Sequence, residues 1–418
     1  MISRFYFNIS IYENFKNFFK ILFFKNHECE NDLKKKLSIL HKYSDFYFFD
    51  HGRTAFYEIL NQLGKKTNKK KILINSFTLF EIINVIIYCG FEPIFIDNKK
   101  NSFHTNIKLD NFSSNLDDIA AIVITHLNGI NLDVINLKKQ ITDHNTSNDK
   151  IFLIEDCAVA FGSQIDNKNV GTFGDYSFLS FNIMKNITSY TGGVLIDNQN
   201  KKLNSFIAEY KILSKIDIIK KIIFVFIIQV LNSKIFFPLF FKLIKYSHKY
   251  SFNFFLKKYR TDFEVRIENK FPLKFSSLMH PFQKKILLKQ FNNFKENQIL
   301  RTKKSKLYYD NLKEINSLDF PQDQFDKKNI FLEFPIICKS TAIKNNLFQY
   351  LMDRKIDIKN YYYKNCSEEK IYNKTSNLCL NSKHISDNIL MLPVHKKIHE
   401  KYQHRIINEI KNFFAKEN

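Results

Sequence analysis

The 418-residue chain contains no CxxC pair, although it has six cysteines, which are scattered between positions 29 and 379. Cysteines spaced in this way are typical of a reducing compartment, and they argue against a disulfide framework and against a zinc site. The spacing therefore predicts free thiols, no bound metal and a cytoplasmic protein.

A compact block of basic residues is also missing, although the formal net charge is +23. Such a charge could indicate nucleic acid or anionic lipid as a partner. The lysines are spread along the whole chain, and the densest run, KKTNKKK (65–71), precedes a strand pattern as a loop would. There is no RNP box and no set of paired zinc ligands. We ascribe the charge to a compositional bias toward Lys, Asn, Ile and Phe, and we expect no nucleic-acid partner.

The N-terminus, MISRFYFNISIYENFKNFFKILFFKN, has no small-residue cleavage site, and Asn, Glu and Lys interrupt its apolar residues. A secretory signal peptide needs both a continuous apolar stretch and such a site. We therefore expect no signal peptide. The pattern instead predicts a basic amphipathic helix, within an N-terminal segment that we place at residues 1–46.

Two apolar runs, IIFVFIIQVL (222–231) and IFFPLFFKLI (235–244), are each too short to cross a bilayer, which takes about 20 residues. The tripeptide NSK (232–234) separates them, inside a hydrophobic insertion at 205–262. Two interpretations stay open, a pair of core helices or a helical hairpin that enters one membrane leaflet. The second predicts that the insertion contacts the inner face of the cytoplasmic membrane rather than the active site. Flanking lysines could then contact lipid headgroups: Lys215, Lys220, Lys221, Lys242 and Lys245.

Strand and helix patterns alternate in a large domain that we place at 47–204. Continuous β-branched runs separated by helices predict a mostly parallel sheet that is buried on both faces. The expected strands are KILIN (71–75), EPIFID (92–97), AAIVITH (120–126), IFLIED (151–156) and SFLSF (177–181), and the expected helices cover 54–64, 80–90 and 133–143.

The C-terminal part predicts a smaller α+β domain at 331–418. A bridging segment, 263–330, precedes it, and the apolar spacing there predicts one long amphipathic helix over 282–315. The strand patterns of the small domain are FLEFPIIC (331–338) and ILMLP (389–393), and its helical patterns cover 340–355 and 398–415.

Polar side chains follow three of the expected strands. His126 and Asp156 end two of them, and the third is followed by Ser180 and Lys185. Open parallel sheets bind ligands beyond the carboxyl ends of their strands, so these groups are expected at one edge. The segment HGRTAF (51–56) predicts a turn that opens a helix, whose free N–H groups can hold a phosphate. Pyridoxal 5'-phosphate (PLP) suits this combination, because its aldehyde takes a lysine and its pyridinium pairs with a carboxylate.

The sequence resembles the DegT/StrS family of PLP-dependent sugar aminotransferases, within the fold-type I class. The resemblance covers 51–198 in unbroken family order and extends to HISDNILMLPVH (384–395), but it skips 205–262. It implies a large domain with a mostly parallel, seven-stranded-type sheet and a small C-terminal α+β domain. The segments that carry it are HGRTAFYEIL, KILINSFTLFEIINVIIYCGFEPIFID, IVITHLNGI, FLIEDCAVAFGS, VGTFGDYSFLSFNIMKN and TGGVLIDN.

By position, the resemblance makes Lys185 and Asp156 the catalytic pair. Lys185 would bond to the PLP aldehyde and, once released, carry a proton between substrate and cofactor carbons. Asp156 would keep the ring nitrogen protonated, so that the ring can accept electrons. The remaining cofactor contacts fall on the phosphate and the ring face: Gly52, Arg53, Thr54, Ser180 and Leu79.

Four positions depart from the family pattern. Val159 stands where Gln or His is usual, Thr191 where an acidic residue is usual, and Pro272 near a common asparagine. Leu79 occupies the place of a stacking ring, with phenylalanines close by. The retained Lys185 argues against the dehydratase branch of the family, in which histidine replaces that lysine.

The resemblance implies amino transfer, with glutamate as donor, to a nucleotide-linked keto-sugar in surface-glycan or secondary-sugar biosynthesis. It also implies a homodimer with the active site at its interface. One alternative is a degenerate, catalytically weak member that acts as a membrane-associated binding subunit, and another is a different PLP reaction on the same lysine.

Several other residues allow two interpretations. His126 and Asn128 either approach the cofactor or form a hydrogen-bonded turn. We expect a structural role for His395. The three consecutive tyrosines either line a sugar pocket or pack internally: Tyr361, Tyr362 and Tyr363.

Overall fold

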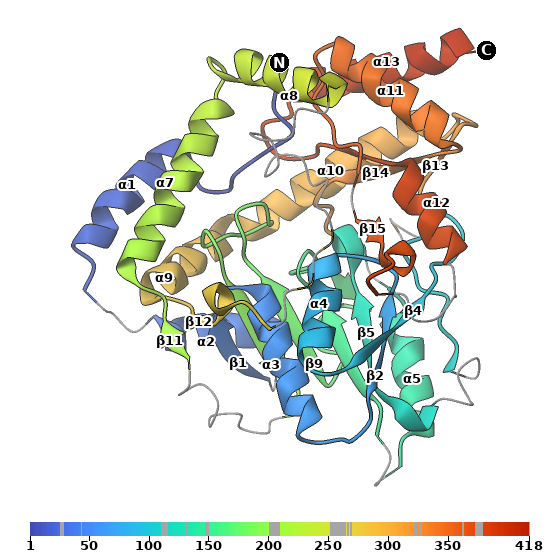
Figure 1. Ribbon diagram of the computed structural model, residues 1–418. Coiled ribbons are helices and arrows are strands. Elements are labelled where there is room, and N and C mark those ends of the chain that lie inside the picture. The colour runs from blue at the N-terminus through green and yellow to red at the C-terminus, as the bar shows by residue number, and fades with distance from the viewer. Residues whose placement is uncertain are drawn as a thin grey trace.

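A nine-stranded mixed sheet forms the centre of the structure, which is a computed structural model (Figure 1). In spatial order its strands are β11 (Lys211–Ile212), β12 (Ser277–Leu278), β1 (Asp45–Phe49), β10 (Gly193–Asp197), β9 (Tyr176–Ser180), β6 (Phe152–Asp156), β5 (Ile119–Thr125), β2 (Lys71–Asn75) and β4 (Glu92–Ile96). The strands from β9 to β4 are parallel, whereas β10 is antiparallel to both β9 and β1. The predicted fold-type I architecture is confirmed, and the two-residue strands β11 and β12 extend the sheet beyond seven strands.

The structure describes residues 1–25, 29–42, 44–109, 116–130, 132–146, 150–199, 210–250, 265, 267, 270–321, 325, 328–361, 363–372 and 379–417.

Helices cover both faces of the sheet, as its apolar strands require. Alternate residues of one strand enter different clusters: Leu73 of β2 belongs to one apolar core, and Ile72 and Ile74 belong to the other. The first core also contains residues of α2 (Glu30–Leu40) and α5 (Val134–His144). The second contains those of α3 (Gly52–Gly64) and α4 (Phe80–Tyr88). The sheet is therefore buried on both sides.

The C-terminal domain is built on an antiparallel sheet of β13 (Leu318–Asp319), β14 (Phe334–Cys338) and β16 (Ile389–Leu392). A short ladder ties it to the large domain, because β15 (Lys364–Asn365) pairs with β3 (Phe77–Thr78). Its helices are α11 (Thr341–Asp353), α12 (Leu380–Asn388) and α13 (Glu400–Glu417), and a further hairpin in the large domain pairs β7 (Gln164–Ile165) with β8 (Lys168–Asn169).

The single long helix predicted over 282–315 is wrong. Two helices occupy the segment, α9 (Pro281–Gln290) and α10 (Phe294–Leu312), and a 3-10 turn at Phe291–Asn293 separates them. The turn contains two asparagines, whose side chains compete with the helical backbone for hydrogen bonds.

The predicted N-terminal amphipathic helix is shorter than its sequence pattern. Helix α1 (Ile11–Leu22) begins only after Ser10, whose hydroxyl accepts from the backbone N–H of Glu13 in a capping box. The residues before Ser10 are not helical, and they contact the C-terminal domain instead. The backbone N–H of Arg4 donates to Asp357, and its guanidinium donates to the Ile358 carbonyl.

The two apolar runs of the insertion form α7 (Lys215–Leu231) and α8 (Phe237–Tyr250), which run in different directions along the molecule (Figure 1). Helix α7 lies against α1, where the Asn14 side chain donates to the Ile222 carbonyl, whereas Lys245 of α8 pairs with Asp353 of α11. No helix among the described residues combines the length and the hydrophobicity needed to span a bilayer. Each helix buries one side and exposes apolar residues on the other.

Candidate active site

Three parallel strands bring the predicted catalytic residues to one edge of the sheet. Thr125 of β5 pairs with Asp156 of β6, and Asp156 pairs with Phe178 of β9. Ser180 is the last residue of β9, and the loop that follows it carries Lys185. The carboxyl ends of strands are where open α/β sheets bind ligands, so the arrangement expected from the sequence is present.

Asp156 and Lys185 act on each other electrostatically. Burial raises the pKa of Asp156 to about 6, although the N–H of Ala158 donates to its carboxylate and the charge of Lys185 opposes the rise. Burial likewise lowers the pKa of Lys185 to about 8, against the attraction of Asp156 and with added repulsion from Lys359 and Arg53. Both groups therefore exchange protons close to neutral pH, as acid–base catalysts need.

The start of helix α3 lies directly against Ser180. A Cβ atom placed on Gly52 would lie 3.0 Å from the Ser180 Cβ and 3.1 Å from the Leu179 carbonyl oxygen, so only glycine fits without a shift. The first turn of a helix has N–H groups without intrahelical partners, and its dipole favours an anion. Gly52 and Ser180 together thus border a position suited to a phosphate.

Arg53 and Thr54 have contacts of their own. The Arg53 guanidinium lies 4.3 Å from the centroid of the Phe275 ring and 3.8 Å from a carboxylate oxygen of Glu81. The Thr54 hydroxyl donates to the Phe275 carbonyl at 2.6 Å, and its N–H donates to the His51 carbonyl at 3.1 Å. Thr54 therefore holds the turn in place through both of its donors.

Leu79 is the residue before α4, and it is half-buried. Its neighbour Phe77 is fully buried and packs against Phe103 in the core, so this ring does not take the place of the missing stacking ring. An aliphatic side chain therefore stands where the family usually has an aromatic one.

His126 and Asn128 form structural contacts. His126 contacts the buried carboxylate of Glu155 at 3.1 Å and accepts the backbone N–H of Leu132. Asn128 has a positive φ of 56° and exchanges two hydrogen bonds with the backbone of Glu333. The turn at Asn128 thus joins the large domain to the segment that leads into the small one.

His126, Glu155 and Cys157 place three possible metal ligands within 4.8 Å of one another. The Glu155 carboxylate, however, already accepts backbone N–H groups from Gly171, Phe173 and Gly174 at 2.7 to 2.8 Å. These contacts give Glu155 a structural role in positioning the loop before β9.

The N-terminal segment holds the loop of Lys185. The side-chain amide of Asn8 donates to the carbonyls of Lys185 and Asn186, at 2.8 and 2.7 Å. Further along the loop, the Tyr190 hydroxyl donates to the Asn14 side chain of α1. Sequence reasoning missed both contacts, because 177 residues separate Asn8 from Lys185.

The insertion also makes a contact close to the predicted site, through Lys221. The Lys221 ammonium of α7 donates at 2.8 Å to the buried carboxylate of Asp50, which lies two residues before Gly52. Burial opposes the ionisation of Asp50, but His51 and Lys221 outweigh it and hold its pKa well below the usual range. Thr191 and Gln283 donate to the same carboxylate.

The remaining predicted positions lie in packed surroundings. Thr191 replaces an acidic residue of the family, and Asp50 supplies a carboxylate beside it. Val159 is buried, and Pro272 precedes the short 3-10 turn at Leu273–Phe275. His395 is buried and stacks on Tyr6 at 5.2 Å, which fits the structural role expected for it.

Of the three consecutive tyrosines, Tyr361 is half-buried and Tyr363 packs edge-on against Phe77 at 6.2 Å. Tyr362 lies outside the described residues.

Comparison with known proteins gives the same assignment. The profile of the DegT/DnrJ/EryC1/StrS aminotransferase family matches residues 49–212 and 254–411. A GDP-perosamine synthase of Vibrio cholerae is 31% identical over 150 residues, which cover 36% of this chain and 39% of that protein. A UDP-4-amino-4,6-dideoxy-N-acetyl-beta-L-altrosamine transaminase of Campylobacter jejuni is 30% identical over 169 residues, covering 40% of this chain and 42% of that protein. These alignments span about two fifths of the curated relatives.

Solved structures extend the likeness to nearly the whole chain. The aminotransferase PseC of Helicobacter pylori superposes with a TM-score of 0.70 over 97% of this chain and 96% of that chain. Because only 16% of the residues are identical, this likeness shows the fold alone.

Proposed function

Since the chain belongs to the DegT/DnrJ/EryC1/StrS aminotransferase family, we propose that it is a PLP-dependent aminotransferase of nucleotide sugars. The reaction would move an amino group from glutamate to a keto-sugar carried on a nucleotide, in the biosynthesis of a surface glycan or a secondary sugar. The observation that carries the proposal is the electrostatic coupling of Asp156 and Lys185 beside the helix start at Gly52.

The donor set at this edge fits PLP. Gly52 leaves no room for a Cβ beside Ser180, so backbone N–H groups and a hydroxyl can approach a phosphate closely. Asp156 is a buried carboxylate that can pair with a ring nitrogen, and Lys185 is an amine that can hold an aldehyde. When bound, PLP supplies an electron-accepting ring and a carbonyl carbon for amino exchange.

The protein groups have separate tasks in this scheme. The positive charge of a pyridinium would favour the ionised form of Asp156, and the carboxylate would in turn keep the ring nitrogen protonated. Lys185, with its pKa lowered to about 8, would remain partly neutral at physiological pH, and so could attack an aldehyde and later carry a proton. The Asn8 amide fixes the backbone on which Lys185 moves.

The names of the relatives support the substrate class. GDP-perosamine synthase and the altrosamine transaminase are both named for amino sugars carried on a nucleotide. Their matched segments correspond to parts of this chain only. An assay is therefore needed to identify the nucleotide base of the substrate and the sugar carbon that receives the amino group.

The test combines cofactor binding with product analysis. The purified chain is supplied with PLP, glutamate and a panel of nucleotide keto-sugars, and amino-sugar products are detected by mass spectrometry. We expect a visible absorbance band from lysine-bound PLP that is absent in Lys185→Ala, together with one aminated product. A chain that stays colourless in excess PLP would instead support a catalytically weak binding subunit, whereas a coloured chain without an aminated product would indicate a different PLP reaction.

Two further proposals concern the assembly. We propose a homodimer with the active site at its interface, because the resemblance places residues of both subunits around the cofactor. Sedimentation should show a dimer, and a fully active monomer would contradict this proposal. We also propose a cytoplasmic enzyme with peripheral membrane contact through the insertion, because α7 and α8 expose apolar residues such as Ile227, Leu239 and Leu243.

A further inference from the structure

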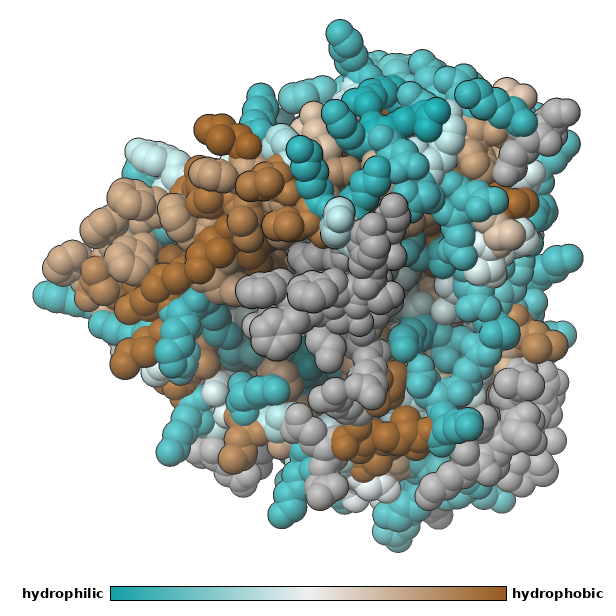
Figure 2. Space-filling view, turned by 45° about the horizontal axis from the view of Figure 1, so that its top comes forward, coloured by the Kyte–Doolittle hydropathy of each residue, from teal (hydrophilic) through white to brown (hydrophobic). Residues whose placement is uncertain are grey.

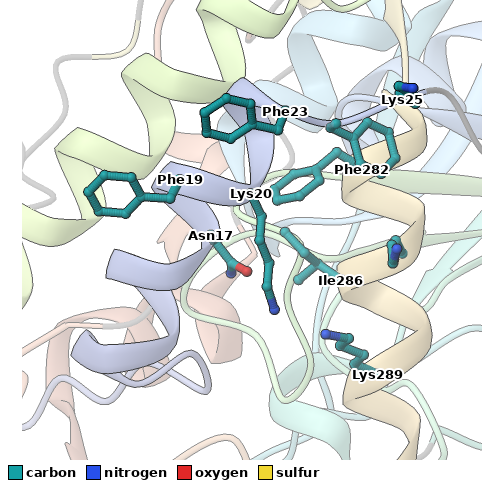
Figure 3. A pocket seen from close by; sticks show the side chains of 10 residues that line it. Asn17, Phe19, Lys20, Phe23, Lys25, Phe282, Ile286 and Lys289 are labelled. Carbon is teal, nitrogen blue, oxygen red and sulfur yellow. The ribbon is translucent and has the colours of Figure 1, made fainter.

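A cleft between α1 and α9 combines lysines with an apolar floor. Its volume is about 550 Å³, and neither Lys185 nor Asp156 lines it (Figure 3). Lys20 and Lys289 point into the same space from the two helices, with Phe282 and Ile286 between them (Figure 3). The cleft is lined by Asn17, Phe19, Lys20, Phe23, Phe24, Lys25, Phe282, Lys285, Ile286 and Lys289.

The four lysines of the cleft have no carboxylate partner in the described part of the chain. Two acidic groups near the cleft, Glu13 and Glu30, make their hydrogen bonds or ion pairs with other groups. Glu13 accepts the Ser10 N–H at 2.9 Å within the capping box, and Glu30 pairs with Lys34 and Lys284. Partial burial, together with repulsion from Lys20 and Lys285, lowers the pKa of Lys289, although the charge of Glu13 opposes this shift. The cleft thus concentrates positive charge that an anion would neutralise.

An exposed apolar surface adjoins the cleft. Phe19 and Phe23 line the cleft itself, yet their exposed fractions are 46% and 82%. The surface continues over the neighbouring helix, and Figure 2 shows hydrophobic residues gathered on the side of the molecule where Figure 1 places α1 and α7. Its other exposed members are Tyr12, Phe15 and Leu22 of α1, with Ile216, Ile223, Phe224, Phe226 and Ile227 of α7.

We propose that this cleft binds the phosphate headgroup of an anionic phospholipid, and that the acyl chains lie along the apolar surface of α1 and α7. A phospholipid fits both the lysine cleft and the apolar surface beside it. The lysines attract its phosphate headgroup, and the aromatic and aliphatic side chains insert beside its acyl chains. A free phosphate would neutralise the lysines and leave Phe19 and Phe23 in water. The inference rests on the membrane contact proposed above and assigns its headgroup site to α1 and α9, outside the insertion.

Helices α1 and α7 of the proposed lipid site also contact the residues around the predicted cofactor site. Helix α1 contacts the loop of Lys185 through Asn14 and Tyr190, and α7 contacts Asp50 through Lys221. The lipid-facing pair of helices is therefore the same pair that supports the predicted cofactor site.

The test is vesicle flotation of the full-length, PLP-supplied protein. Vesicles of phosphatidylcholine are compared with vesicles of phosphatidylcholine and phosphatidylglycerol at about three to one. The test variant combines Lys20→Gln, Lys285→Gln and Lys289→Gln. The control variant, with the same change in charge at exposed lysines elsewhere, combines Lys138→Gln, Lys139→Gln and Lys168→Gln.

We expect the wild type and the control to float with anionic vesicles, and the test variant to partition on the order of a hundredfold less. Excess inorganic phosphate should compete weakly, because it lacks acyl chains. Equal flotation of both variants would overturn the headgroup site. So would complete competition by inorganic phosphate, and so would a wild type that ignores vesicles and self-associates through the α1–α7 surface in sedimentation.

Two controls keep this result separate from the proposed enzymatic function. Absorbance of bound PLP and amino transfer in solution are measured on the same protein batches, and the test variant should retain both. A second variant, Phe19→Ser with Phe23→Ser, should lose flotation while its far-UV circular dichroism stays unchanged. If flotation behaves as expected but no amino transfer occurs, only the enzymatic proposal fails.

Discussion

The candidate active site buries ionisable side chains, whereas the surface of α1 and α7 exposes apolar side chains. Both differ from the usual pattern, in which ionisable groups are exposed and apolar groups are buried. At the edge of the sheet, ionisable groups are taken out of water, as the raised pKa of Asp156 and the lowered pKa of Lys185 show. On the helical surface, apolar groups such as Phe23 are left in water. Both arrangements lower the stability of the folded chain. Within the described part of the chain, hydrogen bonds and ion pairs offset this cost only at the edge of the sheet.

The two regions also differ in whether their charged groups have partners within the chain. Asp156 accepts the Ala158 N–H, and the Asp50 carboxylate beside the site is surrounded by donors. The lysines of the cleft, by contrast, form no salt bridge with a carboxylate among the described residues. Large apolar patches on a protein surface are typical of interaction sites, which supports the lipid contact proposed for the helical surface.

The largest expected effect is on turnover at the sheet edge. Asp156→Ala removes the carboxylate that would keep the cofactor ring protonated, and we expect a loss of amino transfer on the order of a thousandfold or more. Steady-state assays measure the loss, and thermal unfolding checks that the fold is retained. Turnover close to wild type would show that the buried carboxylate of β6 serves structure rather than chemistry.

A pH series sharpens the description of Lys185 as a desolvated amine. Only the neutral amine attacks an aldehyde, so the rate at which the cofactor-free protein captures PLP should rise about tenfold per pH unit below pH 8 and then level off. Because folding lowers this pKa from 10.5, the stability of the cofactor-free protein should also increase as pH rises from about 8 toward 10.5. Stopped-flow absorbance follows the first quantity. A midpoint near 10.5 would mean that Lys185 is solvated like an ordinary lysine.

The contact between the two regions can be broken at Lys221. Lys221→Met leaves the buried Asp50 carboxylate with one charged donor fewer, and we expect a loss of about 2 kcal/mol in the free energy of unfolding at neutral pH. Folding lowers the pKa of Asp50, so its contribution is present above the ordinary value of 3.8 and disappears on acidification. Lys220→Met is the matched control, because the Lys220 side chain is 72% exposed. Equal effects of the two substitutions in urea unfolding would contradict the proposed link.

The smallest expected effect concerns Asn8. Asn8→Ala removes two hydrogen bonds to the backbone of the Lys185 loop, and we expect a severalfold weaker affinity for PLP with little change in the global unfolding transition. Fluorescence titration measures the affinity. Asn311→Ala, which removes contacts with Leu307 and Lys411 in the helices α10 and α13, should leave it unchanged. An unchanged affinity in Asn8→Ala would indicate that the loop keeps its conformation without the N-terminal segment.

The parts of the fold that could be predicted were those with a local signal. Strand β2 was located from the run KILIN, and Asp156 from its place at the end of a β-branched run. The helix expected over 54–64 followed from the turn in HGRTAF, although it begins two residues earlier, at Gly52. These features depend on neighbouring residues, so one sequence was enough to find them.

What could not be predicted depends on contacts between distant segments. Lys221 and Asp50 are 171 residues apart, and no pattern in a single sequence pairs a particular lysine with a particular aspartate. The same holds for Asn8 and for the lysines of the cleft, which come from α1, the residues that follow it and α9. The break at Phe291–Asn293 was missed for another reason, since the apolar spacing continues through the turn although the backbone tightens there.

The most direct test of the enzymatic proposal is the position of the covalent cofactor bond. The protein is incubated with PLP, reduced with borohydride, digested and mapped by mass spectrometry. The proposal predicts that the added mass lies on the peptide that contains Lys185, at close to one per chain. Label spread over other lysines, or none at the Lys185 peptide, would contradict the assignment of this residue and with it the proposed chemistry.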